Sequence, residues 1–133
     1  MKHWQENNRR YIRLFAKSRH KSCRLFYYAF FMQLKNRIHQ NVLYISLDGE
    51  LDEHTAEYTR INMDKIMTVS GALQIVIDLA NLRFMDSTGI GVLIGRYKRM
   101  KDKNIPIYIS NPSSQAERIF KMTGLYQIMP KIS

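Results

Sequence analysis

The chain has 133 residues and is 45% hydrophobic, which suits one core and is too short for two ordinary domains. Its formal net charge is +10, but residues 1–40 hold ten of the 21 Lys and Arg against a single acid, Glu6. Residues 41–133 are nearly neutral, so the domain lacks the basic character that nucleic-acid binding needs. The single cysteine, Cys23, excludes an intramolecular disulfide and favours a reducing cytoplasm.

Residues 1–31 are rich in basic and aromatic side chains. The longest apolar run here, from Leu25 to Met32, is much shorter than the roughly 20 residues of a membrane span, and no small-residue cleavage site follows it. Composition changes abruptly at Met32. We therefore predict a basic extension over 1–31, read from an upstream start codon, and a domain over 32–133. An interfacial helix or an RNA-binding arm is the alternative for the extension.

The first half of the domain predicts a strand, a helix and a second strand. Over residues 42–47 apolar and polar side chains alternate, which is typical of a strand with one buried face. We expect a sharp turn at Gly49, a helix capped by Asp52, and a helix end at Gly71. Residues 75–79 are apolar without alternation, which indicates a central strand covered on more than one side.

The second half predicts an amphipathic helix that starts near Ser87. Apolar residues recur every three or four positions as far as Met100, and Arg96 is expected with other charged residues on the solvent side. A strand over 105–110 follows.

The last predicted helix has two start signals. Asn111-Pro112 supplies a cap and a first-turn proline, and Ser114 with Glu117 has the spacing of a capping box. Gly124 is a typical stop. Strands that alternate with helices of this length predict an α/β fold with a mixed sheet, helices mainly on one face and right-handed crossovers.

The glycines after Ser87 match no phosphate-binding motif. Gly89, Gly91 and Gly95 cluster at a strand-to-helix junction, but their spacing fits neither the P-loop nor the dinucleotide fingerprint. Residues 86–89, Asp-Ser-Thr-Gly, differ from the aspartic protease motif because the glycine comes one residue late. The four histidines are scattered, so no metal site is predicted.

Three blocks of sequence resemble one known family. Residues 84–98, FMDSTGIGVLIGRYK, resemble the phosphorylation-site signature of the bacterial anti-sigma factor antagonists, which are STAS-domain proteins. Residues 47–57, LDGELDEHTAE, resemble the first-turn motif of that family, and residues 120–125, FKMTGL, resemble the end of its C-terminal helix. A serine before a helix is ordinarily only an N-cap. The three blocks together favour a further role for Ser87.

The resemblance implies the STAS fold, with a mixed sheet of four to five strands and helices mainly on one face. It implies a cytoplasmic protein that binds an anti-sigma factor serine kinase and so releases a sigma factor, until the kinase uses ATP to phosphorylate Ser87. A serine phosphatase reverses this modification. Because the kinase carries the catalytic groups, we expect no enzymatic activity, no cofactor, and no direct contact with nucleic acid or membrane.

The predicted partner-binding residues lie on either side of Ser87 in the sequence: Glu50, Asp52, Asp86, Thr88, Gly89 and Gly91. Glu50 and Asp52 resemble an acidic loop that family members present to a basic residue of the kinase. Asp86 either orients the acceptor hydroxyl or simply ends the strand. Gly91, about one turn along the helix, either admits another backbone or serves packing.

The pathway is less defined than the family. Residues 95–98 and 49–57 favour the sporulation type, which acts on sigma factor F, whereas Thr88 stands where sporulation proteins often have serine. A general-stress antagonist with the same mechanism is the alternative. From other classes, a small nucleotide-hydrolysing enzyme and an adaptor that binds membrane or nucleic acid through residues 1–31 remain open.

Overall fold

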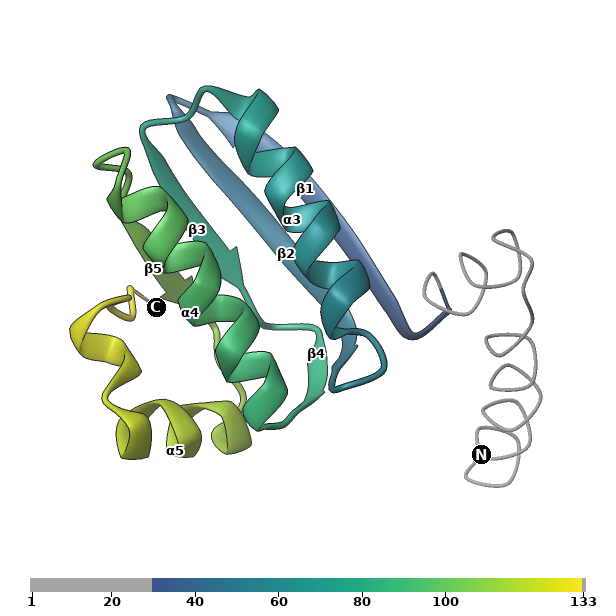
Figure 1. The fold of residues 1–133 in the computed structure, drawn as a ribbon. Coiled ribbons are helices and arrows are strands. Elements are labelled where there is room, and N and C mark those ends of the chain that lie inside the picture. The colour runs from purple at the N-terminus through teal and green to yellow at the C-terminus, as the bar shows by residue number, and fades with distance from the viewer. Residues whose placement is uncertain (1–29, 133) are drawn as a thin grey trace. The chain divides into compact units, whose positions relative to one another are not determined.

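The computed structural model of the chain describes residues 30–132. Our predictions for residues 1–29 lie outside the described residues. From Met32 to Ser133 the chain forms one compact unit. Its elements are β1 (Met32–His39), β2 (Val42–Leu51), α3 (Ala56–Ser70), β3 (Gln74–Asp78), β4 (Leu82–Met85), α4 (Ser87–Lys101), β5 (Ile107–Ser110), α5 (Ser114–Thr123) and a 3-10 turn (Leu125–Gln127) (Figure 1).

Within residues 30–132 five strands form one mixed sheet in the order β1-β2-β3-β5, with β4 paired to the end of β2. β1 is antiparallel to β2, and β3, β4 and β5 join in parallel. Gly49 of β2 lies opposite Met32 of β1 on one side and Leu82 of β4 on the other. β3 and β4 therefore follow each other along the same side of β2. This topology confirms the predicted α/β fold and its mixed sheet.

β2 shows the predicted alternation and runs further than expected. Its fully buried side chains are Leu43, Ile45, Leu47 and Leu51. The predicted sharp turn at Gly49 is wrong, because the strand continues through this residue. Gly49 has φ of 143°, a conformation that favours glycine, and the pairing register with β4 shifts between Gly49 and Glu50.

Two strands, β1 and β4, are missing from the prediction. Only Met32 of β1 is buried, so the sequence of this edge strand carries no alternation of apolar and polar residues. A two-residue turn at Gln40 and Asn41, both with positive φ, joins it to β2, as in tight hairpins. β4 has only four residues, of which Leu82 and Met85 are buried.

The helices α3 and α4 lie side by side on one face of the sheet (Figure 1). Met63 of α3 and Leu93 of α4 are fully buried there. Burial of one such side chain stabilises the fold by about 1.5–3 kcal/mol. α3 and α5 both end as predicted, at Gly71 and Gly124 with φ of 62° and 72°.

Arg96 lies inside the domain, so its predicted place on the solvent side is wrong. Its exposed fraction is 5%, and its Nε lies 2.8 Å from Oδ1 of Asp64 on α3. The two groups are poorly aligned for a hydrogen bond, so the contact is chiefly an ion pair. Burial lowers the pKa of the Arg96 guanidinium from its ordinary value, and Asp64 opposes that shift. Arg99 reaches the other oxygen of Asp64 at 3.0 Å.

α5 starts later than predicted. Its N-cap is Ser113, whose Oγ accepts a hydrogen bond of 3.1 Å from the amide of Ala116. Asn111-Pro112 therefore precedes the cap, and the predicted capping box between Ser114 and Glu117 is wrong. Glu117 instead accepts a bond of 2.7 Å from Nζ of Lys131.

Candidate functional site

Ser87 is the first residue of α4, and the side chain that caps this helix is Asp86. Oδ1 of Asp86 accepts hydrogen bonds from the amides of Thr88 and Gly89, at 2.9 and 3.2 Å. The ordinary interpretation of Ser87 as an N-cap therefore does not apply, and its hydroxyl has no role in the cap. Ser87 is exposed, and its side chain has no hydrogen-bond partner among residues 30–132. An incoming group can reach this hydroxyl without any change in the fold.

The acidic loop after β2 is joined to this helix start. The amide of Asp86 donates to the carbonyl of Leu51, with N and O 3.3 Å apart. Glu50 and Asp52 flank Leu51 in the chain, so the predicted acidic residues lie beside the start of α4. Three acidic residues, Glu50, Asp52 and Asp86, therefore belong to neighbouring segments at one edge of the domain.

Asp52 shapes the loop instead of capping α3. Its Oδ1 accepts from the amides of His54 and Thr55, at 2.9 and 3.2 Å, whereas the N-cap position of α3 is Thr55. The prediction that Asp52 caps α3 is therefore wrong, because the N-cap lies about one helical turn later, at Thr55. This carboxylate closes the turn that precedes the helix.

Thr55 is a residue of this loop that the sequence prediction lacks. It is 1% exposed, and its Oγ1 donates to the carbonyl of Glu50 at 2.7 Å and accepts from the amide of Asp52 at 3.1 Å. One buried hydroxyl thus holds both acidic residues in place. A threonine three positions after an aspartate is a local signal for such a turn.

The two glycines of the predicted partner surface have different surroundings. A Cβ on Gly89 would lie 2.6 Å from Cγ of Met85 and 2.9 Å from Cγ of Leu51, so close packing requires glycine there. Gly89 is also buried, which does not suit direct contact with a partner. Gly91 is exposed, and a Cβ there would meet no heavy atom within 4 Å. Ser87 and Gly91 lie four residues apart, on one side of α4.

Phe84 adds an apolar group beside the acidic edge. It lies on β4 opposite Glu50 of β2, and 42% of the side chain is exposed. The neighbouring residue Arg83 forms an ion pair with Asp48, with Nη1 and Oδ1 3.2 Å apart. Phe84 belongs to the sequence block that resembles the family signature, but only the structure shows that its ring is accessible.

Two other properties of the described residues bear on the site. Among residues 30–132 no group of three or more His, Cys, Asp or Glu is arranged to hold a metal ion. None of the helices in this range has the length and apolar character needed to cross a membrane.

Comparison with known proteins identifies the family. Residues 33–133 match the model of the STAS domain. The chain is 38% identical over 99 residues to the anti-sigma F factor antagonist of Paenibacillus polymyxa, and the aligned region covers 74% of this chain and 85% of that protein. It is 31% identical over 88 residues to the anti-sigma-B factor antagonist of Staphylococcus aureus strain NCTC 8325, which covers 64% of this chain and 78% of the relative.

Solved structures give the same result. The anti-sigma factor antagonist SpoIIAA in its unphosphorylated form matches with a TM-score of 0.63 and 27% identity, over 77% of this chain and 88% of that one. The Bacillus cell fate determinant SpoIIAA in its phosphorylated form matches with a TM-score of 0.59 and the same identity, over 77% and 91%. The chain belongs to the STAS-domain family of anti-sigma factor antagonists.

Proposed function

We propose that this protein is a phosphorylation-controlled antagonist of an anti-sigma factor kinase. In the unphosphorylated form it binds the kinase and thereby releases sigma factor F, and phosphorylation of Ser87 ends that binding. The observation that carries the proposal is the exposed Ser87 hydroxyl at the start of α4, beside the acidic loop. The two solved forms of SpoIIAA, one unphosphorylated and one phosphorylated, support it.

The electrostatics of the helix start suit such a switch. A phosphate on Ser87 adds about −1.5 to −2 charges next to the positive end of α4, so the fold tolerates it. Two amides of the first turn, those of Thr88 and Gly89, already bind Asp86, and the phosphate therefore lies next to a carboxylate. Burying both groups against a partner without a matched cation costs several kcal/mol, and each 1.4 kcal/mol is about tenfold in affinity.

The proposed contact surface follows from exposure and charge. It comprises Ser87 and the following residues: Glu50, Asp52, Asp86, Thr88 and Gly91. Gly89 leaves the predicted set because it packs against Met85 and Leu51. The bare backbone at Gly91 admits a close neighbour, so Gly91→Glu should abolish partner binding in a domain that still folds.

The 38% identity to an anti-sigma F factor antagonist supports the sporulation pathway, and the 31% identity to an anti-sigma-B factor antagonist keeps the general-stress pathway as the alternative. We place the protein in the cytoplasm, where the kinase finds ATP and a serine phosphatase resets Ser87. We also propose that residues 32–133 act alone, so that a chain that starts at Met32 retains binding. Measurement of the intact mass of the native protein tests that start.

The deciding experiment mixes the full chain with the candidate anti-sigma factor kinase and ATP and maps phosphate by mass spectrometry. We expect one phosphate, on Ser87, and none in the Ser87→Ala variant. Ser114→Ala is the matched control, because Ser114 is also the exposed first residue of a helix. Phosphate at another residue, or its persistence in Ser87→Ala, would contradict the mechanism. Pairing the chain with sigma-F and sigma-B kinases separates the two pathways.

A further inference from the structure

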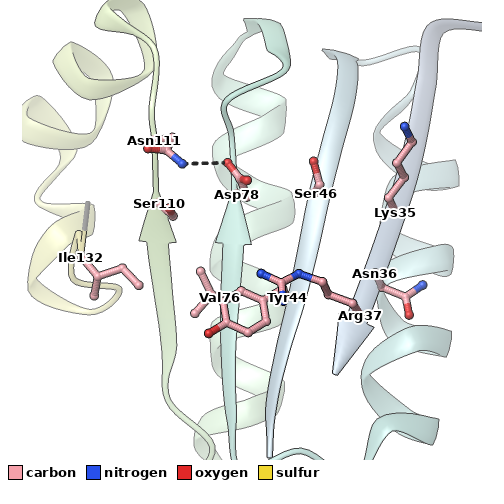
Figure 2. A pocket seen from close by; sticks show the side chains of 10 residues that line it. All are labelled: Lys35, Asn36, Arg37, Tyr44, Ser46, Val76, Asp78, Ser110, Asn111 and Ile132. Carbon is pink, nitrogen blue, oxygen red and sulfur yellow. Dashed lines mark hydrogen bonds between the residues drawn. The ribbon is translucent and has the colours of Figure 1, made fainter. Parts of the chain in front are cut away.

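The face of the sheet opposite α3 and α4 carries a hollow of about 450 Å³ (Figure 2). It lies over β1, β2, β3 and the end of β5. Small organic ligands generally occupy pockets of about 300–1,000 Å³. None of the residues that line it belongs to the Ser87 surface. The hollow is therefore a second feature of the domain, which the proposed function does not use.

Strand pairing arranges the lining residues in two rows. Lys35, Ser46 and Asp78 are register partners across β1, β2 and β3, so they form one row. Arg37, Tyr44 and Val76 form the next row in the same way. Neighbouring strands are about 4.8 Å apart, so about 10 Å separates the cationic strand β1 from the strand that carries Asp78.

The β1 side of the hollow suits an anion. The Arg37 guanidinium lies over the Tyr44 ring, 4.3 Å from its centroid, which holds this cation in place. Lys35 forms no ion pair with any residue of the described chain, and the Ser46 hydroxyl next to it accepts or donates no hydrogen bond there. Two cations and a hydroxyl thus face the same space. Charge-assisted bonds of this kind are about twice as strong as neutral ones.

The floor of the hollow is apolar, and the side away from β1 carries a carboxylate. Val76 and the Tyr44 ring give an apolar floor, and Val76 is 5% exposed. Oδ1 of Asp78 is held by the amide of Ala80 at 2.9 Å and by Nδ2 of Asn111 at 3.3 Å (Figure 2). In the described part of the chain no cation pairs with Asp78. Its carboxylate is therefore fixed and can accept a further hydrogen bond.

We propose that this hollow binds a small organic acid with a flat apolar body and a hydrogen-bond donor at the end opposite the acid group. The acid group lies between Lys35 and Arg37 and bonds to the Ser46 hydroxyl. The flat body lies on Val76, beside the Tyr44 ring that Arg37 covers, and the donor reaches Asp78. The proposal concerns a site separate from Ser87 and does not depend on the proposed function.

A titration of the full chain with 4-hydroxyphenylacetate, followed by two-dimensional amide NMR, tests the site. This probe carries all three groups, phenylacetate lacks the donor, and tyramine replaces the acid by a cation. We expect shifts concentrated at Ser46, Val76 and Asp78. Phenylacetate should bind more weakly than 4-hydroxyphenylacetate because it loses the hydrogen bond to Asp78. Tyramine should bind weakest, by about tenfold or more overall, because its cation replaces the acid group that contacts Lys35 and Arg37.

Variants test the same assignment by an independent route. Lys35→Met should lower the affinity for 4-hydroxyphenylacetate by about fivefold or more. Lys103 is an exposed lysine outside the hollow, so Lys103→Met should leave this affinity unchanged. Asp78→Asn should remove the advantage of 4-hydroxyphenylacetate over phenylacetate. Absence of shifts at about 10 mM probe, tyramine binding as tight as the acids, or shifts centred on Ser87 would overturn the proposal. The three-probe comparison uses the native chain, so it decides even if a variant folds poorly.

Discussion

The starts of α4 and α5 look alike in sequence and differ in surroundings. Each helix begins with an exposed serine, Ser87 or Ser114, and the preceding residue caps it through its side chain. The cap of α4 is the charged Asp86, and the cap of α5 is the neutral Ser113. A serine at the first position of a helix is therefore no signal of function by itself. The charged cap, the acidic loop and the bare helix side distinguish the start of α4.

The contrast continues two and four residues further along each helix. Gly89 of α4 corresponds to the buried Ala116 of α5, and Gly91 corresponds to the exposed Arg118. At the inner position α4 has room only for glycine, and at the outer position it leaves backbone uncovered where α5 presents a long cation. In α4 the inner glycine, Gly89, thus allows close packing, and the outer glycine, Gly91, leaves the helix backbone accessible.

A negative charge at each serine is the sharpest test of this comparison. Ser87→Asp should weaken binding to the anti-sigma factor kinase by about a hundredfold or more, because it places a second carboxylate beside Asp86 within the contact surface. Ser114→Asp should change that affinity less than twofold. Calorimetric or surface-based binding measurements of both variants decide the matter. Equal losses in the two variants would show that the site lies elsewhere.

The ion pairs that hold the two helices should differ in strength. Arg96→Met removes a buried cation that pairs with Asp64 and should lower the free energy of unfolding by about 2–3 kcal/mol. Lys131→Met removes the partner of the more exposed Glu117 and should cost much less, because water screens this pair. Urea denaturation of both variants measures these losses. A neutral Arg96→Met would mean that the methionine packs as well as the ion pair does.

Substitution by alanine should separate the two glycines of α4. Gly89→Ala should lower the free energy of unfolding by about 1–2 kcal/mol, because the new methyl group overlaps Met85 and Leu51. Gly91→Ala should raise it by about 0.5–1 kcal/mol, since alanine is the better helix former and nothing obstructs it. Thermal and urea unfolding provide both values. If both substitutions changed the free energy of unfolding in the same direction, the two glycines would not differ in their packing as the structure indicates.

The smallest expected effect is the acid response of α5. The hydrogen bond from Lys131 lowers the pKa of the Glu117 carboxyl below its ordinary 4.5. Because the pKa is lower in the folded protein, the stabilisation is present above 4.5 and is lost as the pH falls through the folded value. In Lys131→Met the Glu117 pKa should return toward 4.5. An NMR titration of the Glu117 side chain in both proteins measures it, and an unchanged pKa would exclude Lys131 as the cause.

The sequence predicts the parts of this fold that have a local pattern. The alternation in β2, the apolar stripe of α4 and the helix ends at Gly71 and Gly124 all depend on neighbouring residues. β1 escapes prediction because an exposed edge strand needs no apolar face. Arg96 is misplaced because only Asp64, from another helix, makes its burial possible.

The same distinction applies to the site. The sequence predicts a helix start at Ser87 and an acidic segment before it, and the structure brings both to one edge. The cap role of Asp86, the buried hydroxyl of Thr55 and the accessible ring of Phe84 depend on contacts between segments. Packing around Gly89 involves Leu51, 38 positions earlier in the chain, which no local pattern contains.

Thr55 has a consequence for the speed of recognition. Its two hydrogen bonds hold the backbone between Glu50 and Asp52 in one shape before any partner arrives. An approaching molecule therefore meets a prearranged row of negative charges and does not wait for a loop to order. For the proposed complex we therefore expect encounter to limit the rate of formation, and added salt to slow association more than it speeds dissociation.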